Sequence, residues 1–326
     1  MGRIVAGLAS SHALALLEPD EWETRRGMTR ANYQRRYSEV PPERPEIEGE
    51  TLDSNRERHK RLHGALSHLR QRLAELRPDT LVLIGDDQDE NFRPDNLPQF
   101  AIYTGDSVAV ADREGHGADA DPANHPKPYP CDATLSRAIL DGMVEEGFDL
   151  ASSRKMDRLR SHAHVQVLRY MDLQVPIVPI FVNAIHVPAP TPARCYAFGE
   201  ALRRVIEAQP DSKRVAIYAS GGLSHYTAGF PWPDYQGPAT LGYIDVDFDK
   251  RAVDWMATGQ GSQLRTLTSK DVLNSGNIEM RQWIVLMGAM GDVKPSQLVY
   301  EPFFRGLMGM AAGCWELEKE PAGARA

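Results

Sequence analysis

The chain has 326 residues, a length that accommodates one large α/β domain or two domains of about 100–200 residues each. Hydrophobic residues make up 42% of the chain and charged residues 25%, which is typical of a globular protein and excludes a disordered or collagen-like chain. The formal net charge is -8 and the Lys and Arg residues are mixed with acidic ones, so we expect no nucleic-acid partner.

No apolar run approaches the roughly 18 residues that a membrane span needs, and the N-terminal sequence lacks the basic start and long apolar stretch of a signal peptide. The three cysteines, Cys131, Cys195 and Cys314, show no CxxC spacing and are typical of free thiols in a reducing compartment. We therefore expect a cytoplasmic protein without a membrane partner.

Short apolar runs that end in small or polar residues predict strands, and apolar residues at helical spacing predict helices. The predicted strands are Arg3–Ala9, Thr80–Gly85, Gln99–Thr104, Ile177–Asn183 and Val215–Ala219. The predicted helices are Asn55–Leu76, Asp132–Glu146, Thr191–Ala208, Val246–Met256 and Asn277–Met290. The alternation indicates an α/β fold with a mixed central sheet flanked by helices, and the lack of a linker predicts a single domain over residues 1–326.

Two long segments have no regular pattern, Glu18–Gly49 and Asp112–Pro130. Loops of this length inside a compact domain are usually functional. We expect both segments to cover the substrate side of an active site, with surface loops or subunit contacts as the alternative.

Three histidines follow predicted strands: His12 in LASSH, His186 in FVNAIH and His225 in SGGLSH. Ligands of open α/β sheets bind at the carboxyl ends of the strands, so the active site is expected there. Any one such histidine can also be an ordinary loop or capping residue. The glycines of SGGLSH permit close approach of another group and favour a functional role for His225.

Two further side chains are predicted to face inward. His59 lies one heptad before Leu66 on the apolar stripe of the helix that ends at Leu76, and Glu279 begins a helix whose apolar positions start at Trp283. A packed histidine and a carboxylate that complements the helix dipole are the alternatives. Two imidazoles and one carboxylate form the facial triad of non-haem Fe(II) oxygenases, and zinc hydrolases use a similar set.

Taken together, six segments of the sequence resemble the class III extradiol ring-cleaving dioxygenases, the superfamily of the protocatechuate 4,5-dioxygenase catalytic subunit. The matching segments are Ser10–His12, Gly85–Phe92, Ser161–Met171, Val175–Ala184, Ser220–His225 and Asn277–Trp283. The GDDQ strand end within them resembles the branch that acts on methylgallate and gallate.

The resemblance implies that His12 and Glu279 bind Fe(II), that His225 is the catalytic acid and base, and that His162 is a second catalytic imidazole. Ser161 stands where the family usually has an aspartate before this histidine.

Gln88 occupies the place at which many members carry their second histidine ligand. His59 is our candidate for that ligand, with His63 or Gln88 itself as alternatives. Asp86, Asp87 and Gln88 would otherwise contact the ligands or the substrate, and Asn183 and Arg169 are candidates for binding a substrate carboxylate.

The implied activity is insertion of O2 into the ring of a catecholic aromatic acid of the methylgallate, gallate or protocatechuate type, with a ring-opened muconic-type product. The cofactor is expected to be Fe(II), and a homodimer is expected from the family. A metal-dependent hydrolase using the same His/His/Glu site and a non-catalytic scaffold are the alternatives. Metal content and O2 uptake with catechols distinguish these three functions.

Overall fold

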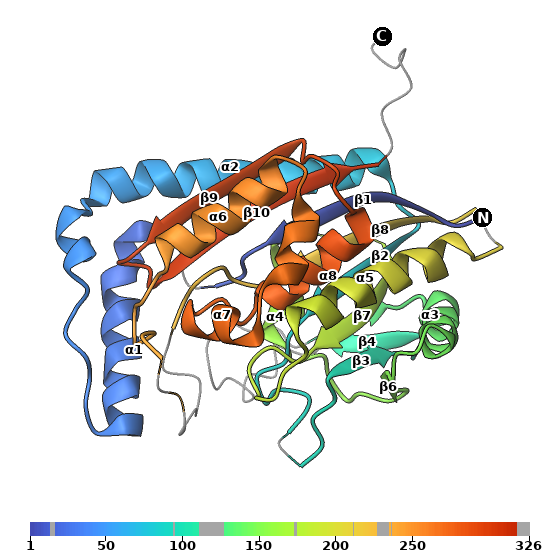
Figure 1. Cartoon of the computed structure of the whole chain (residues 1–326), viewed down its shortest axis with the longest axis horizontal. Coiled ribbons are helices and arrows are strands. Elements are labelled where there is room, and N and C mark those ends of the chain that lie inside the picture. The colour runs from blue at the N-terminus through green and yellow to red at the C-terminus, as the bar shows by residue number, and fades with distance from the viewer. Residues whose placement is uncertain are drawn as a thin grey trace, which may run out of the picture.

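The computed structural model describes residues 1–13, 17–93, 95–110, 127–172, 175–210, 212–226, 235 and 237–317. Within them an eight-stranded mixed sheet has the order β6-β3-β7-β2-β8-β1-β10-β9 (Figure 1). Its strands are β1 (Arg3–Ser10), β2 (Thr80–Gly85), β3 (Phe100–Tyr103), β6 (Ala151–Ser153), β7 (Ile177–Val182), β8 (Arg214–Ser220), β9 (Gln297–Phe303) and β10 (Met308–Glu316). A separate antiparallel pair consists of β4 (Ser107–Val110) and β5 (Lys127–Pro130).

The four central strands β7, β2, β8 and β1 are parallel to one another. On one side β3 pairs antiparallel with β7 and parallel with β6, and on the other side β10 pairs antiparallel with both β1 and β9. The central strands are almost wholly buried and consist of apolar runs, as expected for a parallel sheet covered on both faces. Because they run in one direction, their carboxyl ends share one edge of the sheet. The segments that follow these strands therefore converge there.

Helices cover both faces of the sheet (Figure 1). The helices are α1 (Trp22–Tyr37), α2 (Leu52–Leu76), α3 (Ala133–Glu145), α4 (His162–Met171), α5 (Pro192–Glu207), α6 (Val246–Ala257), α7 (Ser269–Asn274) and α8 (Met280–Met290). Three short 3-10 helices are η2 (Pro19–Glu21), η3 (Pro45–Gly49) and η4 (Gly261–Thr266). One core cluster joins the sheet to α3, α5, α6 and α8, and the other joins it to α2 and α4.

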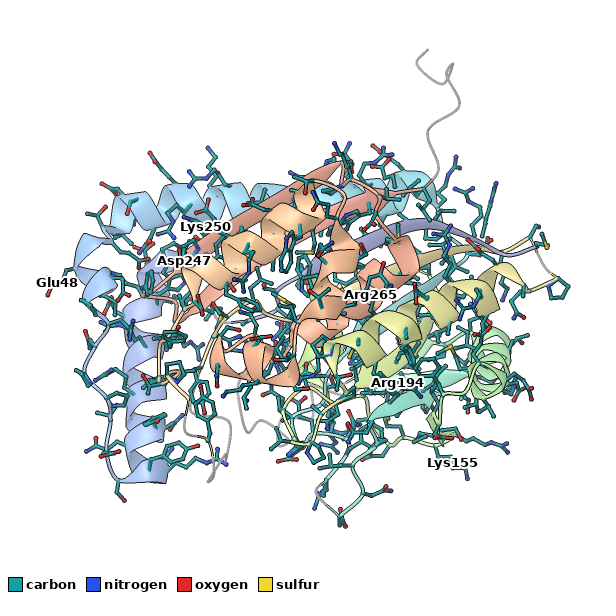
Figure 2. The ribbon with its side chains drawn as sticks, in the orientation of Figure 1. Glu48, Lys155, Arg194, Asp247, Lys250 and Arg265 are labelled. Atoms are coloured by element: carbon teal, nitrogen blue, oxygen red, sulfur yellow. The ribbon has the colours of Figure 1, made fainter. Side chains whose placement is uncertain are left out.

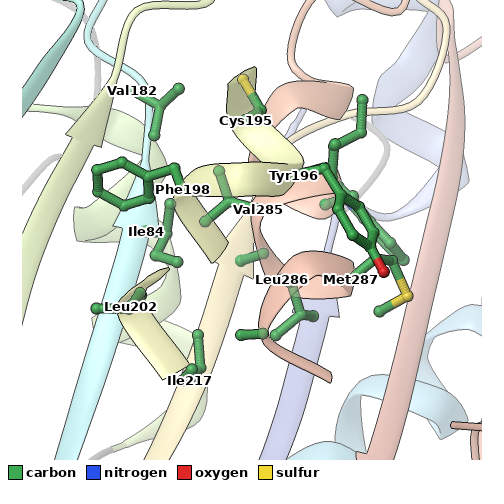
Figure 3. Close-up of a cluster of buried hydrophobic side chains, with 14 of the residues drawn as sticks. Ile84, Val182, Cys195, Tyr196, Phe198, Leu202, Ile217, Val285, Leu286 and Met287 are labelled. Atoms are coloured by element: carbon green, nitrogen blue, oxygen red, sulfur yellow. The ribbon is translucent and has the colours of Figure 1, made fainter. Parts of the chain in front are cut away.

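The first cluster lies between α5, α8 and the central strands (Figure 3). Phe198 and Leu202 of α5 face side chains of β2 and β8, and the two helices approach each other closely. A Cβ atom at Gly199 would lie 1.9 Å from the main-chain oxygen of Val285, so this approach requires glycine. The close packing fixes α8, whose first turn carries a site residue.

On the opposite face, α2 packs its leucine stripe on the sheet. Leu62, Leu69 and Leu73 are fully or almost fully buried, as the heptad spacing predicted. The helix begins with a capping box in which Thr51 and Ser54 exchange hydrogen bonds. These two sequence signals explain where the helix starts and which face it buries.

The predicted α/β class with a mixed sheet between helices is confirmed. All five predicted strands and all five predicted helices are present, with boundary shifts of a few residues. The structure differs within Glu18–Gly49, where α1 forms instead of an irregular segment. Trp22 is its only buried residue, so α1 has no apolar periodicity to reveal it. Most of Asp112–Pro130 lies outside the described residues, and the single-domain range 1–326 stays a prediction.

Of the charged side chains labelled in Figure 2, Arg194, Lys250 and Arg265 lie on the outer surfaces of helices, and Lys155 lies in the segment between β6 and α4. No helix in the described part of the chain is both long enough and apolar enough to span a membrane.

Candidate metal and catalytic site

Residues after three parallel strands form one buried group at the carboxyl edge of the sheet. His12 follows β1, Asp86 and Gln88 follow β2, and His225 ends the loop after β8. Glu279 joins them from the N-cap of α8. These side chains therefore meet at the carboxyl ends of the parallel strands.

The hydrogen bonds of His12 define which ring nitrogen is available. Its Nδ1 lies 3.0 Å from Oγ of Ser220, and this hydroxyl donates to the main-chain oxygen of Ala163 at 2.6 Å. Because the hydroxyl has one proton, it must accept from Nδ1–H, which leaves the lone pair on Nε2. Burial lowers the pKa of His12 to about 3 despite the attraction of Glu279, so the ring is neutral. Its Nε2 lies 3.6 Å from Oε2 of Glu279.

Glu279 is a buried carboxylate held at both oxygens. Oε2 accepts from the main-chain N–H of Gly222 at 2.7 Å, and Oε1 accepts from Nε2 of Gln88 at 2.9 Å. Burial alone would raise the pKa of Glu279, but the neighbouring imidazoles, His225 first, hold it well below its usual range. The side chain is therefore charged and oriented.

His162, the first residue of α4, is held by Glu90. One oxygen of the Glu90 carboxylate accepts from the main-chain N–H of His162 at 2.8 Å, and the carboxylate lies 3.1 Å from Nδ1 of the ring. Burial would lower the pKa of His162, but the hydrogen bond and charge of Glu90 raise it to about 9. With Nδ1 on Glu90, the His162 ring has Nε2 left to act as a ligand, and its centroid lies 4.6 Å from that of His12.

His225 is oriented for proton exchange. Its Nδ1 donates to the main-chain oxygen of Leu223 at 2.8 Å, and its Nε2 lies 3.4 Å from Oε1 of Glu279. Burial would lower the pKa of His225, but the Glu279 carboxylate raises it to about 9. The Nε2 atom is therefore the one that can take up or release a proton at this site.

Three of these side chains can hold a metal ion. One ligand atom from each of His12, His162 and Glu279 lies within 4.8 Å of the other two, and no other such group occurs among the residues that the structure describes. Two imidazoles and one carboxylate with open positions fit Fe(II), and the contact of Glu90 with His162 is of the kind that metal-binding histidines make through their second nitrogen. The residues present therefore fit the implied metal.

Asp86 and Gln88 lie beside this group. Gln88 Nε2 donates to Oδ2 of Asp86 at 3.3 Å as well as to Glu279, so its amide bridges two carboxyl groups. Burial and the charge of Glu279 raise the pKa of Asp86 well above its usual range. A neutral Asp86 lets the two carboxyl groups share one buried site without repulsion.

The predicted role of His59 as a ligand is corrected by the structure. His59 is buried on α2, as the heptad spacing predicted, but its ring lies 3.9 Å from that of His63 and 5.9 Å from that of Trp22. Its Nδ1 is 3.8 Å from the Glu18 carboxylate, and the residue does not belong to the metal-binding group. The spacing identified the buried face of α2 but not the neighbours of that face. His162 supplies the third donor of the group instead.

Arg169 and Asn183 stay predictions as contacts for a substrate carboxylate. Arg169 is exposed and lies seven residues along α4 from His162, about 10 Å along the helix axis. Asn183 donates from Nδ2 to the main-chain oxygen of His186 at 2.7 Å and accepts from its N–H at 3.0 Å. The Asn183 amide therefore organises the turn after β7, and His186 Nε2 lies 2.8 Å from Asp89 of the loop after β2.

Sequence reasoning missed Glu90. Four acidic residues follow β2, and their order alone does not show which one turns toward His162. In the structure the Asp87 carboxylate accepts from the main-chain N–H groups of Glu90, Asn91 and Phe92, which turns the segment. The Asn91 side chain then accepts from the main-chain N–H groups of residues 160 and 161 beside α4. An aspartate that can close a turn on the following amides was the available signal.

The fold and site thus define an α/β protein with a buried two-histidine, one-carboxylate group at the strand ends. The profile of a family described as the catalytic LigB subunit of aromatic ring-opening dioxygenase matches residues 40–310. The chain belongs to this family, which confirms the resemblance to class III extradiol dioxygenases.

Curated relatives carry related names. The chain is 27% identical over 208 residues to gallate dioxygenase of Pseudomonas putida, and the aligned region covers 61% of this chain and 56% of the relative. It is 32% identical over 164 residues to the 2,3-dihydroxyphenylpropionate/2,3-dihydroxicinnamic acid 1,2-dioxygenase of Klebsiella pneumoniae, covering 49% of this chain and 48% of that protein. The chain thus spans about half the length of the curated relatives it matches. These names give no support to the hydrolase alternative.

A solved structure, that of the uncharacterized protein JW3007 from Escherichia coli K12, is similar with a TM-score of 0.48 and 10% identity, covering 95% of this chain and 99% of the other.

Proposed function

We propose that this protein is an Fe(II)-dependent extradiol dioxygenase that opens the ring of a catecholic aromatic acid of the methylgallate, gallate or protocatechuate type. The observation that carries the proposal is the buried group of His12, His162 and Glu279 beside His225, in a chain of a ring-opening dioxygenase family. Relatives named for gallate and for 2,3-dihydroxyphenylpropionate support the substrate class. The product would be a muconic-type acid or semialdehyde.

His12, His162 and Glu279 would hold the ion, because they offer two ring nitrogens and one charged carboxylate within one small volume. When bound, Fe(II) would supply open coordination positions for the diol and O2 and would let electrons pass from the diol, which is oxidised, to O2. Gln88 and the main-chain N–H of Gly222 fix the Glu279 carboxylate in the orientation described above. Glu90 does the same for His162.

His225 would move the proton. In the neutral form of the ring, Nε2 takes a proton from a hydroxyl group of the diol, and the Glu279 carboxylate 3.4 Å away stabilises the charged ring that results. His225 can later return this proton to the product. The Leu223 carbonyl keeps the proton on Nδ1 in place, so exchange occurs at one atom.

Three of the four proposed site residues are shielded from water, while the His162 side chain keeps 21% of its surface exposed. The side chains of His12, Glu279 and His225 are nearly inaccessible, with 1%, 1% and 6% of their surface exposed. In such surroundings charges interact more strongly than in water, and side reactions of reduced oxygen with solvent are suppressed.

The test is anaerobic loading with Fe(II), followed by O2 uptake and product analysis with protocatechuate, gallate, 3-O-methylgallate and catechol. We expect O2 consumption and a ring-opened product with at least one of these diols. His162→Ala should lose both iron and turnover. His225→Ala should retain iron and lose about 10²–10⁴-fold in kcat, because its role is proton transfer. Iron-loaded protein that consumes no O2 with any diol would contradict the proposal.

The homodimer implied by the resemblance belongs to this proposal as well, because closed two-fold dimers are the commonest assemblies of soluble proteins. A molar mass of twice the chain mass in light scattering is the expected result, and a monomer at all concentrations would refute it. The cytoplasmic location stays a prediction from the sequence.

A further inference from the structure

Asp249 of α6 is a fully buried carboxylate for which the proposed reaction has no direct use. Four donors surround it. Its Oδ1 accepts from Nδ2 of Asn277 at 2.8 Å and from the main-chain N–H of Ser224 at 3.2 Å. Its Oδ2 accepts from Oγ of Ser224 and from the hydroxyl of Tyr300, each at 2.6 Å.

All four of these donors are neutral, so burial of the charged Asp249 carboxylate costs free energy that no cation offsets. A buried charge without a cation is stable only when hydrogen bonds replace the water that it loses. Burial accordingly raises the pKa of Asp249 to about 6, even though the hydrogen bonds oppose this shift. A neutral side chain of similar size would fill the space at lower cost, so the carboxylate is explained by the segments that it holds together.

The donors come from the two segments that deliver the proposed catalytic residues. Ser224 directly precedes His225, and Asn277 lies two residues before Glu279. The main chain joins the same segments, because the N–H of His225 donates to the oxygen of Gly276 at 3.1 Å. Asp249 is thus the side chain at which both segments meet.

The sheet contributes to this arrangement. Tyr300 belongs to β9, and the main-chain N–H of Gly309 in β10 donates to the Ser224 oxygen at 2.8 Å. A Cβ atom at Gly309 would lie only 2.4 Å from Oδ2 of Asp249, so the strand passes directly against the carboxylate. The Asp249 carboxylate is therefore fixed by a helix, by two strands and by the loop after β8.

We propose that Asp249 is a positioning residue that sets His225 at its working distance from Glu279. It holds Ser224 on one side and Asn277 on the other, so the separation of the two active side chains depends on one buried carboxylate. The inference rests on the proposed function, since it assigns His225 a reaction to serve.

The test compares Asp249→Asn with wild type in the Fe(II)-loaded protein. Asparagine keeps the size, but its single oxygen cannot accept from all four donors, and its NH2 group would face a donor. A shift of His225 by a fraction of an ångström is expected to lower kcat by about 10- to 100-fold with little change in KM, because misplacement of this order costs that much. Iron content is expected to stay at the wild-type level.

Asp132→Asn is the matched control. Asp132 is the N-cap of α3, and its carboxylate accepts from Thr80 and from the ammonium group of Lys213, at the amino end of β2. It therefore lies at the opposite edge of the sheet from the site. This variant is expected to lower the melting temperature while kcat stays within about twofold of wild type.

A second readout separates positioning from stability. Anaerobic binding of 4-nitrocatechol reports the ionisation of the bound diol through its visible spectrum. Wild type is expected to bind the more ionised form, and Asp249→Asn a less ionised one, because the displaced His225 accepts the proton less well.

Ser224→Ala removes the hydroxyl bond to Asp249 and should show the same spectral change in a smaller degree, so the inference remains testable if Asp249→Asn does not fold. Wild type that cleaves diols while both variants retain its kcat and its nitrocatechol spectrum would overturn the role of Asp249 alone. Wild type that binds iron but cleaves no diol would instead overturn the proposed function.

Discussion

A methyl group added at Gly222 would push on the proposed catalytic base. A Cβ atom built at this position lies 2.7 Å from Cε1 and Nδ1 of His225 and 3.3 Å from Oε2 of Glu279. The main-chain N–H of Gly222 donates to Glu279, and alanine at this position would keep that hydrogen bond. The substitution therefore tests the position of the His225 ring more than the charge of the site.

The size of the effect follows from the contact distance. Ordinary van der Waals contact begins at 3.4 Å, so the ring must move by about 0.7 Å to accept the methyl group. The hydrogen bond from Nδ1 to the Leu223 oxygen, at 2.8 Å, resists this movement. Since a displacement of about 1 Å can cost 100-fold in rate, we expect kcat to fall about 10- to 100-fold, or about 1.4–2.7 kcal/mol in the barrier.

The assay is the initial rate of O2 uptake at saturating diol, with iron content and circular dichroism measured on the same preparation. Gly64→Ala in α2 is the matched control, because a Cβ atom there meets nothing within 4 Å. Alanine should stabilise that helix by about 1 kcal/mol and leave kcat unchanged. If Gly222→Ala binds iron, folds normally and keeps the wild-type kcat, the placement of His225 in the proton-transfer step is refuted.

Glu90→Gln should weaken Fe(II) binding about 10- to 100-fold in an anaerobic chelator competition, because the Glu90 carboxylate orients His162. The control is Glu301→Gln, which loses its bonds to two arginines of α2 and should leave the iron affinity unchanged. Equal iron affinities in the two variants would exclude the role of Glu90 in orienting His162. His59→Ala should keep wild-type iron content but lose about 1–3 kcal/mol in urea unfolding, whereas loss of iron would return His59 to the ligand set. The folded-state pKa of Asp249, about 6, exceeds its ordinary value of 3.8, so its stabilising contribution is present below pH 3.8 and is lost as the pH rises through about 6. Urea unfolding at several pH values should therefore show wild type gaining stability relative to Asp249→Asn on acidification, and a difference independent of pH would contradict the burial of this charge.

Strand ends and a helix start that are visible in the sequence predicted three residues of the candidate site. His12 and His225 follow strands whose apolar runs are plain in the sequence, and Glu279 precedes a helix with a clear buried face. Because parallel strands end at one edge, residues far apart in the chain could be expected to meet. The structure does bring these three side chains together.

The remaining residues depend on contacts that the sequence does not display. The heptad of α2 places His59 on the buried face, but only the packing of Trp22 and His63 against that part of the helix determines its neighbours. His162 reaches the group because Asp87 and Asn91 shape the segment after β2, and such turns arise from hydrogen bonds between distant residues. The last two strands of the chain, β9 and β10, were not predicted for a related reason.

These strands, β9 at the edge and β10 between it and β1, complete one side of the mixed sheet. Pro302 interrupts the first, and the second is rich in glycine and alanine, so neither shows the alternating pattern of a typical strand. Their pairing in the sheet, with β10 against β1, stabilises them in place of intrinsic propensity.

The central claim is that the His12, His162 and Glu279 group, with His225, serves insertion of O2 into an aromatic ring. The most direct measurement is the mass of the ring-opened product formed under ¹⁸O₂ in ordinary water by the Fe(II)-loaded protein. We predict that both labelled oxygen atoms enter the product, apart from any that exchange with water, and that His225→Ala forms the same labelled product more slowly. A product whose new oxygen comes only from water, tested in the converse experiment with H₂¹⁸O and unlabelled O2, would contradict the account.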